Sequence, residues 1–443
     1  MYYIVAFFLV VNLKGLTGGS LVFKFLPNFI LLLGIFRYAF LSRGRIYLRK
    51  MYFESNFTMY GLYLIVFLIS LLRTAFPNAT FTGLLNDVLS VIFLNLLVYA
   101  ALGYHFRNPD NFDKLFIKGT LQAIMVPSAL IAFMLFLYII GYNDPNTVLR
   151  RQGEEAIILK LIGISLPKKS IPFTDGAHPN TISIFAGATL VMTLVALWLL
   201  EVSRKEKIFL YINVVVCAAF MLIADSRGTI LSFVVTLAMV YATYKVRFTG
   251  ALRVFILVVP FLPFIFSGFL AAFADSPLLA QFARSGDTKN LTTLSSRSII
   301  WEECLEEVLE PKTMHIIGFG EHGQSTAGVS ARYAYIFPKD AYETDLIVTH
   351  NMFFQSFFDI GYLGTFFFLG ALFLCLNNAI FLYNKGYKTG LVYIGFILYF
   401  VLSGTLESTF GNHNRPYNQT LMTMLMAIVF FKNEYTRLSS QKW

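Results

Sequence analysis

Long apolar runs separated by short polar hinges dominate the chain. Most runs are near twenty residues long, which is the length that an α-helix needs to cross the hydrocarbon core of a bilayer. A spanning β-barrel would instead show segments of about ten residues with alternating polarity. The runs predict twelve transmembrane helices, at about 2–13, 21–41, 57–75, 84–104, 115–140, 180–200, 208–224, 229–244, 254–273, 351–383, 390–405 and 417–431.

Two of these runs differ from the rest in length. Residues 2–13 are few for a full crossing. They lack the basic start and the small-residue cleavage site of a signal peptide, so we interpret them as a short first span. Residues 351–383 are long enough to tilt strongly or to protrude from the bilayer.

The composition supports a lipid-embedded fold. Hydrophobic residues make up 57% of the chain and charged residues 14%, against roughly 25% charged in soluble domains. Mean hydropathy is +0.65. So little charge does not cover a globule of this length with polar surface. We therefore expect an all-α polytopic membrane protein with one integral membrane domain over residues 1–443.

The distribution of Lys and Arg predicts the orientation of the helices. One set of alternate hinges, with the C-terminal tail, carries 17 Lys and Arg in 59 residues, whereas the opposite set carries 14 in 146. The positive-inside rule assigns the first set to the cytoplasm. Both termini are then cytoplasmic, and two large loops, 141–179 and 274–350, lie on the outer face. The net charge of +10 is scattered over short hinges, which excludes a basic stripe for nucleic acid.

The second large loop contains the pattern of an amphipathic helix. Ser295 and Ser296 precede a helical run that ends at Pro311. The expected apolar face, which suits a membrane interface, comprises Trp301, Cys304, Leu305 and Val308, with Glu302, Glu303, Glu306, Glu307 and Glu310 largely opposite. Arg297 lies four residues before Trp301, so helical spacing puts it on the apolar face.

Two polar clusters at the ends of predicted spans are candidates for chemistry. Arg227 belongs to the short outer turn 225–228, where an Arg either reaches the membrane interface or points into a cavity. His350 and Asn351 stand where the chain re-enters the bilayer at the start of a helix. The positive end of the helix dipole favours a neutral imidazole there, which suits a general base, although a helix-capping role fits equally.

Other polar groups carry less information. The last outer turn, 407–415, is unusually polar, and its His413 and Arg415 either line the same cavity or cap two helices. The sequence G-F-G-E-H-G at 318–323 matches a dinucleotide motif outside a βαβ unit, so we interpret it as a flexible turn that does not open a helix. His315 and His322 are interpreted as solvated loop residues, and no metal site is expected. Three scattered cysteines give no disulfide framework.

Three blocks in order resemble one protein family. H-N-M-F-F-Q-S-F-F-D-I-G-Y-L-G, from His350 to Gly364, matches the pattern H-[NSQ]-x9-G-x-x-[GTY] of bacterial O-antigen ligases and their polymerase relatives. The stretch S-R-S-I-I-W through I-I-G-F-G-E-H-G resembles the outer-loop block of that superfamily, and A-D-S-R-G-T-I-L-S-F resembles its S-R-G turn.

The resemblance implies a metal-independent, cofactor-free glycosyltransferase of the bacterial inner membrane, with a periplasmic active site. The donor would be a glycan linked to undecaprenyl pyrophosphate in the membrane lipid. Arg227 and Arg297 would hold the pyrophosphate, and His350 would activate the acceptor hydroxyl. Expected substrate-binding residues are Asn351, Arg415, His413, Trp301, Tyr333 and Tyr335. A chain-length regulator and a flippase of the same pathway are candidate partners.

Three functions remain open from the sequence. A polymerase would extend a carrier-linked glycan, and the basic loop 141–179 favours it because it suits a second anionic substrate. An O-antigen ligase would transfer the glycan to lipid A-core. A flippase or secondary transporter would use ionisable groups within its spans, of which the chain has Lys24, Arg37, Arg73, Asp87 and Lys118.

Overall fold

The structure, a computed structural model, is helical throughout the regular elements that it describes. It describes residues 3–4, 6–7, 10, 21–41, 55–73, 81–105, 111–140, 179–224, 226–262, 265, 297–337, 347–407 and 416–440. No strand occurs within these ranges. The expected all-α fold class therefore holds for the described chain.

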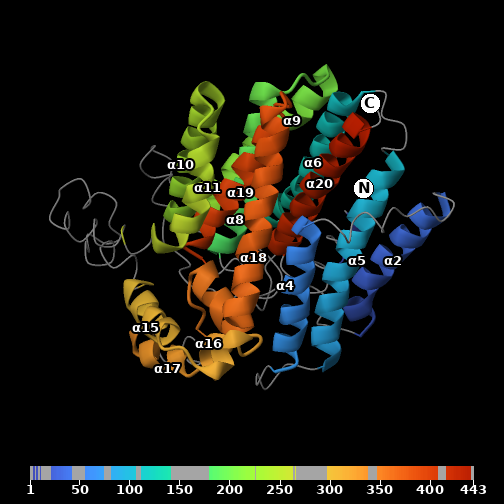
Figure 1. Ribbon diagram of the computed structural model, residues 1–443. Coiled ribbons are helices and arrows are strands. Elements are labelled where there is room, and N and C mark those ends of the chain that lie inside the picture. The colour runs from blue at the N-terminus through green and yellow to red at the C-terminus, as the bar shows by residue number, and fades with distance from the viewer. Residues whose placement is uncertain are drawn as a thin grey trace.

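Long helices form the body of the molecule (Figure 1). They are α2 (Leu21–Leu41), α4 (Ser55–Leu71), α5 (Phe81–His105), α6 (Phe112–Ile139), α8 (Pro179–Leu199), α9 (Arg204–Ala224), α10 (Arg227–Val246), α11 (Thr249–Val258), α18 (Met352–Asn384), α19 (Gly390–Gly404) and α20 (Pro416–Ser440). A smaller layer contains α15 (Arg297–Leu309), α16 (Gly323–Thr326), α17 (Val329–Tyr333) and the 3₁₀ turns η4 (Thr313–Ile316) and η5 (Ala334–Ile336); η2 (Val259–Phe261) follows α11.

The long helices overlap the predicted apolar runs from residue 21 onward, and of the run 254–273 the structure describes only residues 254–262 and 265. Among the described residues, five segments are long and apolar enough to cross a membrane, within α6, α8, α9, α10 and α18. Five shorter apolar helical segments lie within α2, α4, α5, α11–η2 and α19. The chain is thus a helical membrane protein, and the count of twelve spans stays a prediction. The predicted first span, 2–13, lies largely outside the described residues.

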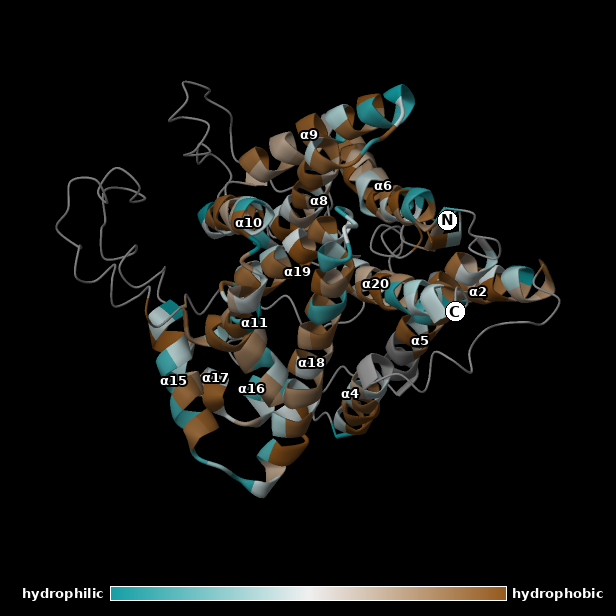
Figure 2. Ribbon diagram, turned by 45° about the horizontal axis from the view of Figure 1, so that its top comes forward, coloured by the Kyte–Doolittle hydropathy of each residue, from teal (hydrophilic) through white to brown (hydrophobic). Residues whose placement is uncertain are grey.

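Large apolar side chains cover the outer surface of the bundle, as expected for helices in lipid. The exposed fraction is 86% for Phe40, 68% for Val215 and 61% for Phe366, on three different helices. Figure 2 shows hydrophobic residues along most of the bundle helices, with hydrophilic residues gathered at helix ends and on α15. In water such a surface would favour aggregation, so lipid is its compatible solvent.

Helix α18 connects the parts of the bundle. It packs against α4 on one side, α19 and α20 on another, and the small layer near its N-terminal end. Helix α8 packs against α9, α10 and α19, while α2 and α5 pair with each other. Gly187 of α8 lies so close to α19 that an added Cβ would stand 2.0 Å from the hydroxyl oxygen of Tyr399.

Hinges that the charge pattern assigned to the same side do lie at the same end of the bundle. The ring of Phe112, at the start of α6, is 5.0 Å from Tyr387 and 5.8 Å from Tyr435. The Tyr383 hydroxyl donates to the carbonyl of Thr243 at the end of α10 (3.4 Å). The small layer lies at the opposite end (Figure 1). The assignment of the first end to the cytoplasm stays a prediction.

Helix α15 confirms the predicted helix in the second large loop and corrects its polarity. Ile300, Trp301 and Cys304 are buried, as expected for the apolar face. Glu307, which the pattern placed with the exposed glutamates, is only 1% exposed. It is buried because basic side chains of the same layer neutralise it. The serines expected to cap this helix lie outside the described residues.

Helix α18 is broken at Gly361, which has φ 69° and ψ −173°. In an unbroken helix, the carbonyls of Phe358 and Asp359 would accept from amides four residues ahead. Here the Phe358 carbonyl accepts from the amide of Phe319 (2.8 Å) and the Asp359 carbonyl accepts from that of Gly320 (2.9 Å). The loop before α16 therefore takes over hydrogen bonds that the break releases.

The glycines of this loop allow close contact with α18. Gly318 has φ 85°, and a Cβ on Gly361 would lie 2.4 Å from the Gly318 amide nitrogen. The Gly323 amide donates to the Asp359 carboxylate (2.9 Å). The G-F-G-E-H-G stretch is thus a packed connector that opens the short helix α16. Our interpretation of it as a flexible turn that opens no helix was wrong, because its glycines serve contact with α18.

We predict that Gly361→Ala destabilises the protein by more than about 2 kcal/mol, because it adds a backbone clash to the cost of a φ and ψ combination essentially restricted to glycine, about 1–3 kcal/mol. Gly328→Ala is the matched control, since Gly328 also has a positive φ (77°) but no atom within 4 Å of an added Cβ. Thermal unfolding in detergent measures both. Equal losses of stability in the two variants would contradict the close-contact role of Gly361.

Candidate functional site

The backbone of His350 is held in an uncommon conformation just before α18. Its φ is 49°, in the left-handed region that non-glycine residues rarely adopt. Asn351, the next residue, caps α18: its side-chain oxygen accepts from the amides of Phe353 (2.8 Å) and Phe354 (3.3 Å). The capping role that the sequence left open for His350 therefore belongs to Asn351.

Both neighbours of His350 are fixed to other elements. The indole nitrogen of Trp301, on α15, donates to the carbonyl of Thr349 (3.1 Å). The side-chain amide nitrogen of Asn351 (Nδ2) donates to the backbone carbonyl of Thr405 (3.2 Å), just after α19. Thr349, Asn351 and Trp301 are all fully buried. A strained residue between two buried anchors is typical of a functional position, where geometry takes precedence over local stability.

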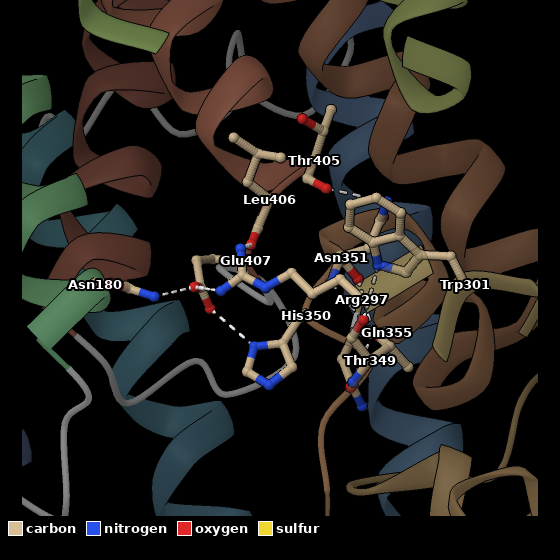
Figure 3. Close-up of polar contacts among 10 residues, drawn as sticks. All are labelled: Asn180, Arg297, Trp301, Thr349, His350, Asn351, Gln355, Thr405, Leu406 and Glu407. Carbon is tan, nitrogen blue, oxygen red and sulfur yellow. Dashed lines mark hydrogen bonds and ion pairs between the residues drawn. The ribbon is translucent and has the colours of Figure 1, made fainter. Parts of the chain in front are cut away.

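The carboxylate of Glu407 lies between the imidazole of His350 and the guanidinium of Arg297 (Figure 3). Glu407 Oε2 is 3.1 Å from His350 Nδ1, and Glu407 Oε1 forms an ion pair with Arg297 Nη2. Arg297 Nη1 also donates to the carbonyl of Leu406 (2.6 Å). The exposed side-chain fractions of Arg297, His350 and Glu407 are 17%, 20% and 10%. All three are thus largely shielded, and each keeps some exposed side-chain surface.

Helix α8 supplies a fourth polar group. The side-chain amide of Asn180, in the first turn of α8, donates to Glu407 Oε1. One turn further, the hydroxyls of Ser183 and Thr229 are 2.5 Å apart, which joins the start of α8 to the start of α10. The N-terminal ends of α8, α10, α15 and α18 therefore meet beside the turn 405–407.

Arg227 is the first residue of α10 and borders the same turn. A Cβ on the adjacent Gly228 would lie 2.8 Å from Leu406 Cδ1, so the helix start and this turn are in close contact. Of the three residues that the sequence selected, Arg297 and His350 contact Glu407 through their side chains, and Arg227 begins the helix whose next residue, Gly228, borders Leu406. They lie far apart along the chain, and the fold brings them to one end of the bundle.

A buried polar network supports the segment 347–351 from behind. Gln355 Oε1 accepts from the amide of Thr349 (3.3 Å), and Gln355 Nε2 donates to Asp359 (2.9 Å) and to Gln324 (2.7 Å). Gln324 in turn donates to the carbonyl of Ile347 (3.2 Å). The broken first part of α18 and the small layer therefore hold the approach to His350 together.

The structure does not support direct substrate contact by three of the residues expected to bind substrate. Trp301, Tyr333 and Asn351 are fully buried. The Tyr333 hydroxyl donates to the Ile347 carbonyl (2.8 Å), so its ring belongs to the core of the small layer. Tyr335 is 74% exposed and remains available to a glycan. His413 and Arg415 lie outside the described residues.

Sequence reasoning did not select Glu407 or Asn180. Glu407 follows the apolar run of α19, and an acidic residue at the end of such a run is the signal that could have identified it. Asn180 follows Pro179 at the start of α8, where Asn is ordinarily interpreted as part of a helix start. Its contact with Glu407 follows only from the tertiary arrangement.

The small layer has its own charge cluster around the buried carboxylate of Glu307. Glu307 forms ion pairs with Lys312 and with Arg332 Nη2 (2.6 Å), and its Oε1 lies 3.2 Å from His315 Nε2. Burial of the Glu307 carboxyl raises its pKa, but the hydrogen bonds and charges of Lys312 and Arg332 outweigh this, so the net pKa is lowered. His315 is fully buried between aromatic rings, so its expected solvated state was wrong.

Within the described ranges, no group of three or more His, Cys, Asp or Glu side chains is arranged to hold a metal ion. His315 and His322 therefore belong to no such group in that part of the chain. The described cysteines, Cys217, Cys304 and Cys375, are free thiols and buried. Burial raises the pKa of the Cys304 thiol well above its usual value, which disfavours the reactive thiolate.

Comparison with known proteins identifies a family for the central part of the chain. Residues 212–369 match the family described as O-antigen ligase. The matched stretch contains Arg227, Arg297 and His350, whereas Asn180 and Glu407 lie outside it. No curated protein matches the chain. The resemblance to the O-antigen ligase and polymerase superfamily is confirmed by this match.

We predict that Glu307→Gln lowers the free energy of unfolding at pH 7 by about 1–2 kcal/mol, because it removes charge-assisted hydrogen bonds from Lys312 and Arg332, whose own side chains are partly exposed to water. The folded pKa of Glu307 is lowered, so its stabilisation is present above the ordinary glutamate pKa of about 4.3 and is lost as pH falls through the folded value. The wild-type and variant unfolding curves should converge in acid.

Thermal unfolding between pH 7 and pH 3.5, followed by circular dichroism, measures this difference. Glu302→Gln is the control, since Glu302 is exposed on the same helix. Because wild type and Glu307→Gln both retain His315, Lys312 and Arg332, the difference in their stabilities at each pH reports the contribution of the Glu307 carboxylate alone. A stability difference that grows in acid would contradict the assigned direction of the pKa.

Proposed function

We propose that this chain, in which residues 212–369 match the O-antigen ligase family, is a membrane glycosyltransferase that uses a glycan linked to undecaprenyl pyrophosphate. The family match points to an enzyme of O-antigen processing in a bacterial membrane. The proposed reaction takes place on the periplasmic face of the inner membrane. The single observation that carries the proposal is the meeting of Arg297 and His350 at the carboxylate of Glu407.

The two arginines suit the donor's leaving group. A pyrophosphate at the membrane surface requires fixed, partly desolvated cations, and the planar guanidinium fork matches phosphate oxygens. Arg297 is largely shielded, and Arg227 begins a helix beside the same turn. As the bond between the sugar and the pyrophosphate breaks, negative charge grows on the departing oxygen. Arg227 and Arg297 would stabilise that charge without a metal ion.

His350 suits the role of general base. The contact with Glu407 favours the tautomer with the proton on Nδ1, which leaves Nε2 as an acceptor. In the proposed step, the acceptor oxygen bonds to the anomeric carbon, the bond from that carbon to the pyrophosphate oxygen breaks, and the hydroxyl proton moves to His350 Nε2. Glu407 stabilises the positive charge that forms on the imidazole in this step.

Polymerisation of repeat units is the proposed outcome, with transfer to lipid A-core as the alternative. The basic segment 141–179 leads directly into α8, whose first turn carries Asn180. That continuity supports a second anionic, carrier-linked substrate approaching from this segment. The segment itself lies outside the described residues, apart from Pro179.

The transporter alternative receives less support. Of the ionisable residues in predicted spans, Arg37 and Lys118 are exposed on the bundle surface. Arg73 lies at the end of α4 and contacts Met314 of the small layer. The side chains of Lys24 and Asp87 lie outside the described part of the chain. A chain-length regulator and a flippase remain proposed partners of the pathway.

We predict that Arg227→Ala, Arg297→Ala and His350→Ala each lower glycan transfer by at least about 10²-fold, because each removes charge stabilisation or proton transfer from the chemical step. Lys at either Arg position should rescue poorly, since it lacks the bidentate fork. Transfer by purified protein in lipid nanodiscs, from undecaprenyl-pyrophosphate glycan, is the assay. EDTA should leave the wild-type rate unchanged.

Arg253→Ala is the matched control. Arg253 donates to Asn377 of α18 (2.7 Å), about 24 Å along the helix from the break at Gly361 by the rise of 1.5 Å per residue. The substitution Arg253→Ala removes a positive charge from the same bundle but alters no residue of the site. Full activity of all three site variants, or strong inhibition by EDTA, would contradict the proposed mechanism.

We predict that deletion of the gene from its bacterium leaves lipopolysaccharide core capped with one repeat unit, because a polymerase adds every later repeat. Gel electrophoresis of lipopolysaccharide distinguishes the outcomes. Bare core would identify a ligase. Unchanged core without surface glycan would point to an exopolysaccharide pathway or to transport.

A further inference from the structure

The guanidinium of Arg297 is already engaged by protein acceptors. Its Nη2 pairs with Glu407 Oε1, and its Nη1 donates to the Leu406 carbonyl (2.6 Å). A pyrophosphate held by the forked edge of this guanidinium would compete with the carboxylate for the same N–H groups. The Glu407 carboxylate also cancels the charge of Arg297, so the pair as a whole attracts an anion weakly.

Glu407 also contacts a second group, the imidazole of His350, whose positive charge it can stabilise. Its Oε2 lies 3.1 Å from His350 Nδ1, and its Oε1 also accepts from Asn180. Movement of Arg297 toward an anion therefore does not leave the carboxylate without polar contacts. The imidazole remains beside it, and Asn180 retains a donor to the oxygen that Arg297 gives up.

We infer that Glu407 is a charge-exchange residue, which holds Arg297 until a pyrophosphate displaces it and which then acts on His350 alone. The inference rests on the proposed function and adds a regulatory step to the same site. With Arg297 turned to the pyrophosphate, the full negative charge of Glu407 favours proton uptake by His350. Binding of the donor thereby raises the basicity of the group that activates the acceptor.

This coupling has a consequence for unproductive reactions. Before the pyrophosphate arrives, the positive charge of Arg297 offsets that of the carboxylate, so Glu407 stabilises a developing imidazolium less. An acceptor hydroxyl or water that enters early then meets a site that is not yet activated. Glu407 is a positioning residue in this scheme, because it acts through Arg297 and His350 and touches no reacting atom.

The test separates binding from turnover in Glu407→Gln. Without the carboxylate charge, Arg297 is free to bind an anion, so we expect the Kd for undecaprenyl pyrophosphate to fall about tenfold. Turnover should fall about 10²-fold, because the imidazolium loses its stabilising charge. A role in folding alone would weaken binding and turnover together. Titration of undecaprenyl pyrophosphate into nanodisc-embedded protein gives the Kd, and the transfer assay gives kcat and KM.

Glu434→Gln is the matched control, because Glu434 pairs with Arg437 on α20 (2.8 Å), away from the site. It should change neither the Kd nor kcat. Asn180→Ala removes a donor from the same carboxylate oxygen but keeps the charge, so it should not tighten binding. Unchanged or weaker binding of undecaprenyl pyrophosphate by a folded Glu407→Gln protein would overturn the exchange.

Two further readouts keep the outcomes distinct. If wild-type protein binds no undecaprenyl pyrophosphate, or if Arg297→Ala leaves the Kd unchanged, the proposed function itself fails. If Glu407→Gln does not fold, infrared difference spectra of wild-type protein with ¹³C-labelled glutamate provide the test. Addition of undecaprenyl pyrophosphate should shift a carboxylate band, and intact binding without such a shift would overturn the exchange.

Discussion

The carboxylate of Glu407 faces a guanidinium on one side and an imidazole on the other, and the site depends on this double contact. An isolated carboxylate at 10% side-chain exposure is costly, because burial removes it from water. Arg297, His350 and Asn180 compensate that cost with charge and hydrogen bonds. The same contacts draw the ends of four helices to one place, so the requirement to satisfy one buried charge also determines the geometry of the site.

The surrounding architecture makes this arrangement rigid. The break at Gly361 separates the first part of α18 from the rest of the helix. Backbone amides of the loop around Gly318 and Gly320 donate hydrogen bonds to the carbonyls that the break releases. Gln355 and Asp359 then connect that part of the helix to the segment before His350. The strain stored at His350, with φ 49°, is thus compensated by buried neighbours.

The sequence predicted the helices well because lipid imposes a simple rule on length and polarity, and α2 to α20 follow the apolar runs. It also selected Arg227 and His350 at the ends of apolar runs and Arg297 on the apolar face of an amphipathic helix, and the family resemblance joined the three. It failed where tertiary contacts decide. The helical periodicity predicted that Glu307 lies on an exposed acidic face. Its burial is explained by its ion pairs with Lys312 and Arg332, which only the tertiary structure shows. Trp301 and Tyr333 were expected to bind substrate, yet both donate hydrogen bonds that anchor the segment before His350. Glu407 was visible as a polar boundary residue, but its partners come from α8, α15 and the start of α18.

The central claim is that one carboxylate joins a pyrophosphate-binding arginine to a catalytic histidine. An electron cryomicroscopy structure of the nanodisc-embedded chain with undecaprenyl pyrophosphate tests it most directly. The account predicts pyrophosphate density against Arg227 and Arg297, with the Glu407 carboxylate in contact with His350. Pyrophosphate density elsewhere on the chain, with the contacts of Arg297, Glu407 and His350 unaltered, would contradict it.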